Sequence, residues 1–118
     1  MSAATIVTNL TPHWVNIVDP ADKTTVIRSF EPASVPARCV EKRTDEGVVS
    51  DNIPVSAVSY GEVTGLPPRQ QGTIYIVSML VAQTHPHRKD LMFPGEIVRD
   101  ERGVIIGTTG LSYFSVNF

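Results

Sequence analysis

The sequence predicts a mainly β fold, a small barrel or sandwich of six to eight short strands with one or two short helices; an α+β arrangement is the second choice. Two observations lead to this prediction. Apolar and β-branched residues come in short runs, and nine prolines and eight glycines separate those runs. Hydrophobic residues make up 42% of the chain and charged residues 19%, as in ordinary globular proteins. The length of 118 residues fits one domain, residues 1–118.

The first third of the chain predicts a single strand followed by a hairpin. Thr5–Leu10 is β-branched and apolar, and Thr11–His13 should bend the chain because proline removes a ladder donor. Trp14–Val18 and Thr24–Phe30 then alternate in polarity on either side of Asp19–Lys23, which has the composition of a turn. We therefore expect these two runs to pair.

The middle of the chain predicts two more strands and two loops. Ala37–Lys42 should be a strand, and Val55–Val63 another. Between them, Arg43–Asn52 is polar and is expected to form a surface turn or a hairpin loop. Gly65–Gly72, which reads GLPPRQQG, is the clearest loop because two glycines enclose a Pro-Pro pair.

The longest apolar run, Ile74–Ala82, should be the centre of the hydrophobic core. Its start is β-rich, so we expect a strand as far as Val77. Ser78 then suits the N-cap of about two helical turns, which Pro86 would end. The competing interpretation continues the strand to Gln83.

The C-terminal part predicts a further hairpin. Glu96–Asp100 and Val104–Thr109 are its strands, and Gly103 stands where the turn needs a positive φ. Leu111–Phe118 alternates weakly and is expected to add an edge strand.

Charge and motifs narrow the classes of function. The net charge is −2 with no basic cluster, which argues against a nucleic-acid partner. No apolar run approaches the roughly 20 residues that span a bilayer, so we expect no membrane partner. One cysteine, Cys39, allows no internal disulfide and favours a cytoplasmic location. No cofactor-binding fingerprint occurs, so no cofactor is predicted.

Histidine and cysteine offer weak signals for metal binding or catalysis. His85 and His87 would share a face of an extended chain, with Asp90 or His13 as a third ligand. They lie beside a proline in a polar turn without any metal-binding motif, and we predict no metal. Cys39 lies in the middle of a predicted strand, where cysteine is usually a small buried hydrophobe. No catalytic residue is assigned, and the sequence leans away from an enzyme.

A looser group of residues suggests a ligand-binding site. Arg88 and Asp90 directly follow the central run, Arg69 lies in the loop before that run, and His13 lies at the N-terminal bend. A guanidinium group binds carboxylate or phosphate through two hydrogen bonds, so Arg88 is the natural anion ligand. The alternative, which we rate somewhat higher, is that Arg88 pairs with Asp90 and only holds the turn in place. Glu62 is a further candidate, with an outward-facing strand residue as its ordinary interpretation.

Several motifs resemble a widespread family of small bacteriophage and bacterial proteins for which no activity is established. The motifs are N-L-T-P-H at Asn9–His13, G-E-V-T-G-L-P at Gly61–Pro67, Y-I-V-S at Tyr75–Ser78, R-x-D-L-x-x-P at Arg88–Pro94 and V-R-D-x-x-G-x-I-I-G at Val98–Gly107. The resemblance implies a phage or prophage accessory protein in the cytoplasm of a bacterial host. It adds Asn9 to the candidate ligand-binding residues and includes Glu62 again, because the motifs contain polar residues at turns.

Three functions follow from the sequence. The first is a non-catalytic binding module that sequesters a small anionic, nucleotide-like ligand or occludes a host defence protein. The second is a structural or assembly subunit of a phage or of a homo-oligomer, because exposed strand edges invite pairing between chains. The third is a small enzyme acting on a nucleotide or phosphoester with one of the three histidines as general base.

Overall fold

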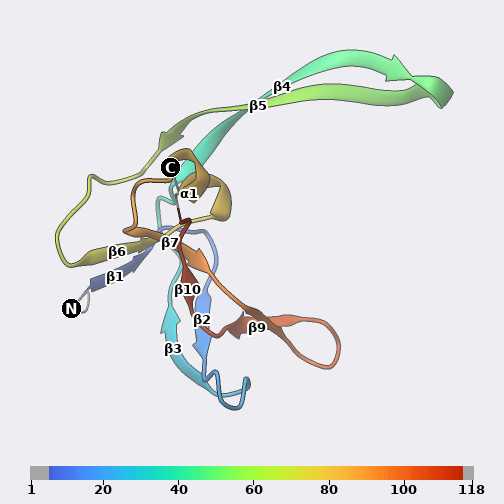
Figure 1. Cartoon of the computed structure of the whole chain (residues 1–118). Coiled ribbons are helices and arrows are strands. Elements are labelled where there is room, and N and C mark those ends of the chain that lie inside the picture. Colours follow the sequence, from blue (N-terminus) through green and yellow to red (C-terminus); the bar gives the residue numbers. More distant parts are fainter. Residues whose placement is uncertain (1–5, 116–118) are drawn as a thin grey trace.

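A computed structural model describes residues 6–115, which form ten strands, one α-helix and one 3₁₀ turn in three separate sheets (Figure 1). The strands are β1 Ile6–Asn9, β2 Val15–Val18, β3 Val26–Phe30, β4 Arg38–Val49, β5 Ile53–Thr64, β6 Thr73–Ile76, β7 Leu91–Pro94, β8 Ile97–Arg99, β9 Ile105–Thr108 and β10 Leu111–Ser112. The helix α1 is Met79–Thr84, and the 3₁₀ turn is Ser50–Asn52. The prediction of a mainly β fold with few helices is confirmed, although these residues form no closed barrel.

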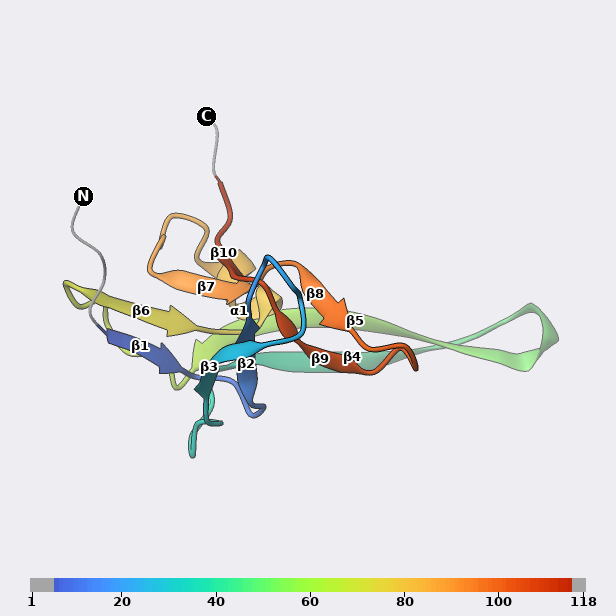
Figure 2. The ribbon, with the colours of Figure 1, turned by 90° about the horizontal axis from the view of Figure 1, so that it is seen from below.

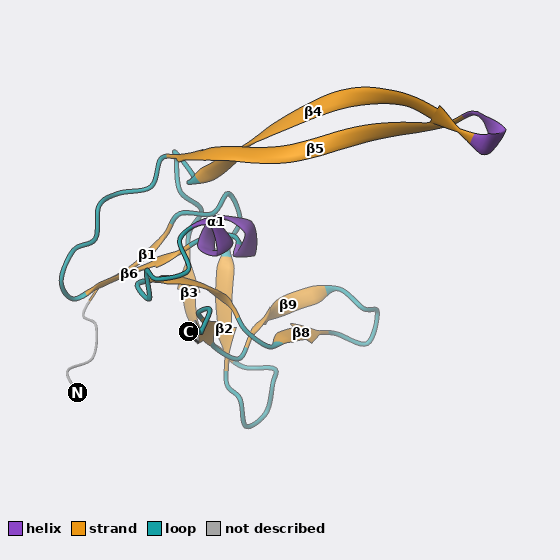
Figure 3. Ribbon diagram, turned by 45° about the horizontal axis from the view of Figure 1, so that its top comes forward, coloured by secondary structure: helices purple, strands orange, loops and turns teal. Residues whose placement is uncertain are grey.

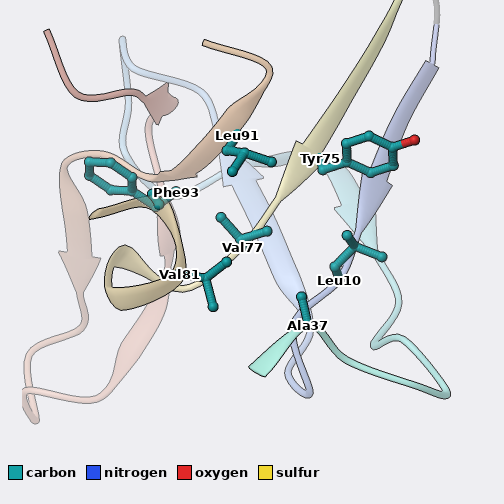
Figure 4. Close-up of a cluster of buried hydrophobic side chains, with 8 residues drawn as sticks. Leu10, Ala37, Tyr75, Val77, Val81, Leu91 and Phe93 are labelled. Carbon is teal, nitrogen blue, oxygen red and sulfur yellow. The ribbon is translucent and has the colours of Figure 1, made fainter. Parts of the chain in front are cut away.

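The first sheet holds the core and has the strand order β1-β6-β7-β10. Strand β6 lies between β1 and β7 and runs parallel to both. Parallel neighbours need a crossover, and α1 supplies it between β6 and β7. The core side chains gather between this sheet and α1 (Figure 4). They are Leu10, Ala37, Tyr75, Val77, Val81, Ala82, Leu91 and Phe93. The expectation that the central apolar run is buried is confirmed.

Helix α1 begins where the sequence indicates. The Ser78 hydroxyl accepts a hydrogen bond from the Val81 amide at 3.2 Å, as an N-cap does. The helix ends at Thr84, shortly before Pro86, so the competing continuation of the strand to Gln83 is wrong. Strand β7, Leu91–Pro94, was not predicted, because its four residues directly follow a polar turn and are too few to show a period.

The second sheet, β3-β2-β9-β8, consists of the two predicted hairpins joined edge to edge. Strands β2 and β3 pair antiparallel, as do β8 and β9, and Gly103 has the expected positive φ of 82°. The hairpins meet where β2 and β9 run parallel, with Ile17 opposite Thr108. A side chain at Gly107 would come within 2.6 Å of the Asn16 carbonyl oxygen, so only glycine permits this approach. Strand β10 is a C-terminal edge strand as expected, but it covers Leu111–Ser112 and residues 113–115 of the prediction are not in a strand. Residues 116–118 of that prediction lie outside the described residues.

The third sheet is a long hairpin of β4 and β5, here called the arm. The arm projects from the rest of the chain, here called the body (Figures 1, 2 and 3). Each strand has 12 residues. A bulge at Gly47, where φ is 89°, interrupts the pairing. At the tip, Asp51 and Asn52 adopt positive φ, which these residue types tolerate. The radius of gyration of 17.3 Å exceeds the roughly 13.5 Å expected for a compact domain of this length, consistent with a projecting arm.

The arm corrects one expectation. Arg43–Asn52 was expected to form a turn or loop, but β4 continues as a strand to Val49 and only Ser50–Asn52 turns the chain. The polar composition of this segment indicated exposure and was interpreted as a loop. A strand with water on both faces carries the same composition, so polarity alone does not separate the two.

Candidate functional site

Arg88 and Asp90 form the most buried ion pair among the described residues. The guanidinium Nε donates to Asp90 Oδ1 at 3.1 Å, and Nη2 donates to Oδ2 at 2.7 Å, so the pair is held by two bonds. The third nitrogen, Nη1, donates to the Pro67 carbonyl oxygen at 3.1 Å. The turn after α1 is thereby held against the 65–72 loop. The alternative interpretation, that Arg88 pairs with Asp90, describes this geometry.

The two charges of this pair stabilise each other. Burial alone would raise the pKa of the Asp90 carboxyl group, but the hydrogen bonds and the positive charge of Arg88 outweigh it, and the pKa lies below its usual value. The charge of Arg69 contributes in the same direction. In turn, the hydrogen bonds with Asp90 raise the pKa of the Arg88 guanidinium. Both groups are charged at neutral pH, and each satisfies the other.

Asn9 is buried and organises the bend between β1 and β2. Its side-chain amide nitrogen donates to the carbonyl oxygens of His13 at 2.8 Å, Glu31 at 3.0 Å and Phe30 at 3.3 Å. Its side-chain oxygen accepts from the Thr11 backbone amide at 2.9 Å and from the Thr11 hydroxyl at 2.7 Å. The identity of Asn9 therefore follows from folding, because these bonds tie the bend to the segment after β3.

The remaining candidates from the sequence are exposed side chains on separate elements. His13 lies in the bend after β1, Glu62 lies near the root of the arm on β5, and Arg69 lies in the loop before β6. Of the six candidate ligand-binding residues, hydrogen bonds join Arg88 to Asp90 and the Asn9 side chain to the His13 backbone. Within residues 6–115, every buried side-chain nitrogen or oxygen has a hydrogen-bond partner. No buried polar side-chain atom in this range is thus left without a partner and available to a ligand.

The histidines were weak candidates for metal ligands. His85 Nδ1 lies 2.7 Å from the Thr84 hydroxyl, at the C-terminal end of α1. Residues 6–115 contain no group of three or more histidine, cysteine or acidic side chains placed to hold a metal ion.

A membrane-spanning helix would need a long apolar stretch, and no helix among residues 6–115 has one.

A groove of about 730 Å³ runs beside the edge strand β1. Its walls include Val7, Leu10 and the exposed ring of Trp14, and the segment after β3 faces them. Glu31 is the charged residue of the lining, which contains no arginine or lysine. An anionic ligand would meet a carboxylate here, so the groove does not favour one.

No known protein family, curated protein or solved structure matches the chain.

The arm is the surface that the sequence did not single out. Apart from Cys39 and Val63, which pack against the core near the root, every residue of β4 and β5 is exposed. Seven large apolar side chains are among the exposed ones, namely Val40, Val48, Val49, Ile53, Val55, Val58 and Tyr60. The signal was present, because Val55–Val63 was recognised as a β run. The sequence did not show that β4 pairs with this run over its whole length, so the projecting hairpin was not predicted.

Proposed function

We propose that the protein is a non-catalytic assembly subunit that uses the β4–β5 arm to join protein chains. The observation that supports this proposal is the apolar, exposed arm itself: Val48, Val49 and Ile53 near its tip are each more than half exposed. Exposed large apolar side chains in this number on one element are typical of surfaces that contact another protein. A phage or bacterial accessory protein, as the family resemblance implies, fits such a role.

The marginal stability expected of an isolated arm supports the same proposal. A two-stranded hairpin is at best marginally stable in water, and it becomes stable when a third strand or another surface packs against it. Beyond Cys39 and Val63 the arm contacts too little of the body to bury either face. A partner chain would supply the missing contacts, and the apolar side chains would then leave water.

The other functions suggested by the sequence stay predictions. Sequestration of an anionic, nucleotide-like ligand would draw on Arg88, whose three side-chain nitrogens already donate to Asp90 and Pro67. Occlusion of a host defence protein would use an exposed surface, and the arm serves that purpose as well as it serves self-association. The proposal of an assembly subunit is favoured because strand edges and apolar faces that find no support in one chain are available on every copy.

A variant that keeps only the root of the arm, here called the arm-less variant, tests this function. Lys42 and Ser59 are cross-strand partners, so replacing Arg43–Val58 by Asn-Gly closes the hairpin with a two-residue turn. Light scattering over a concentration series should give more than one chain mass for the full protein and one chain mass for the variant. The thermal unfolding midpoint of the dilute proteins is the control, and we expect it to stay within a few degrees because the core lies in the body.

Two results would overturn the proposal. One is a full protein that stays monomeric at every concentration. The other is an arm-less variant that associates as strongly as the full protein while remaining folded.

A further inference from the structure

The two edges of the arm differ in charge. Strand β4 carries six charged residues, which are Arg38, Glu41, Lys42, Arg43, Asp45 and Glu46. Strand β5 has the same length and carries one, Glu62, close to the root. Charged side chains are the usual means by which an edge strand is kept from pairing with another chain. The β4 edge therefore has this protection, and most of the β5 edge lacks it.

The unprotected part of β5 has the composition of a strand inside a sheet. From Ile53 to Gly61 it has no charged residue, and Val55, Val58 and Tyr60 are exposed apolar side chains. Among the described residues, β4 is the one strand that pairs with β5, so the second edge of β5 is open. Along that edge, alternate residues direct their amide and carbonyl groups away from β4. Pro54 has no amide to offer, which places the best pairing segment between Val55 and Tyr60.

We propose that two copies of this chain join along β5, antiparallel and across a two-fold axis, into a four-stranded sheet of order β4-β5-β5-β4. This inference rests on the proposed assembly function and names the partner and the contact. A two-fold contact brings a surface against itself, so it requires self-complementarity. An uncharged strand meets that requirement, because no like charges come to face each other across the axis.

The same arrangement explains the charges on β4. In the joined sheet the two β4 strands become the outer edges. Each β4 strand carries six charged residues, and these charges would oppose the addition of a third copy. The assembly therefore stops at a dimer and does not grow into a fibre. Because the arms run antiparallel, the tip of each arm lies towards the root of the other, where the exposed Val40 is located.

A matched pair of lysine substitutions tests the edge. Thr44 and Ala57 are cross-strand partners, so they lie at the same distance along the arm and on the same face. Both are exposed in one chain, and neither Thr44→Lys nor Ala57→Lys should affect folding of the monomer. We expect Thr44→Lys to leave the dimer dissociation constant within about threefold of the unsubstituted protein. Ala57→Lys places two like charges beside the axis and should raise that constant at least about tenfold.

Sedimentation equilibrium on the full chain and both variants measures these constants, with circular dichroism to confirm equal folding. Equal dissociation constants for the two variants would overturn the β5 contact. If the arm-less variant is then still monomeric, the assembly function stands and the contact lies elsewhere on the arm. A full chain that forms complexes larger than a dimer would overturn the proposal of a two-fold β5 pair. A full chain that is monomeric would overturn both that proposal and the assembly function.

Discussion

The body and the arm use similar residues in opposite surroundings. In the body, Val77 and Leu91 are at most 1% exposed, whereas Val48 on the arm is 63% exposed. The body binds its polar groups internally, as at Asn9, while the arm leaves an entire strand edge open. The body therefore has the contacts that a fold needs within one chain, and the arm has contacts to offer to another chain.

Truncating a leucine in the body and a valine in the arm should give the largest difference in the free energy of unfolding between the two regions. Leu91→Ala removes a side chain from the centre of the core and should lower the free energy of unfolding by about 2 to 5 kcal/mol. Val58→Ala on the arm should change that free energy by less than about 0.5 kcal/mol in the dilute monomer. Urea unfolding followed by tryptophan fluorescence of both variants measures the difference. Equal losses in the two variants would mean that the arm is part of the cooperative core.

Removing Arg88 tests the body at its ion pair. Arg88→Met leaves the Asp90 carboxylate buried without a partner and frees the 65–72 loop, so we expect a loss of about 3 kcal/mol. Arg69→Met is the control, because that side chain is exposed and its change should stay within about 0.5 kcal/mol. An Arg88→Met protein as stable as the control would show that the pair does not hold the turn.

The pH dependence of the same pair gives a smaller effect. Because the pKa of Asp90 is lowered on folding, its ionisation adds stability that is complete above the unfolded-chain pKa of about 3.9. That stability is lost as the pH falls through the lower pKa of the folded state. The gap in unfolding free energy between the unsubstituted protein and Asp90→Asn should thus be constant from pH 7 to pH 5 and shrink in more acidic solution. A gap that widens on acidification would contradict the assigned direction.

Much of the body was predictable from local patterns. The apolar run through Val77, the N-cap at Ser78 and the turn at Gly103 follow from periodicity, capping and turn chemistry, which act over a few residues. The parallel pairing of β6 with β1 and β7 was not predicted, because long-range pairing leaves no such local signal.

The candidate site and the arm were harder to predict. The sequence did bring Arg88 and Asp90 together, and it raised the alternative that they satisfy each other. It gave no sign that the Arg88 guanidinium also reaches the Pro67 carbonyl, since that contact depends on how α1 folds back. The arm was missed because exposed strands and polar loops have similar composition. Its length became evident once the cross-strand register was known.

Hydrogen exchange of the arm at two protein concentrations tests the central claim most directly. If β5 is the contact between copies, those amides of Val55–Tyr60 that point away from β4 should exchange more slowly as the concentration rises through the dimer dissociation constant. The amides of the buried strand β6 should not change, because the core is complete within one chain. Protection of Val55–Tyr60 that is independent of concentration, whether high or low, would contradict the account.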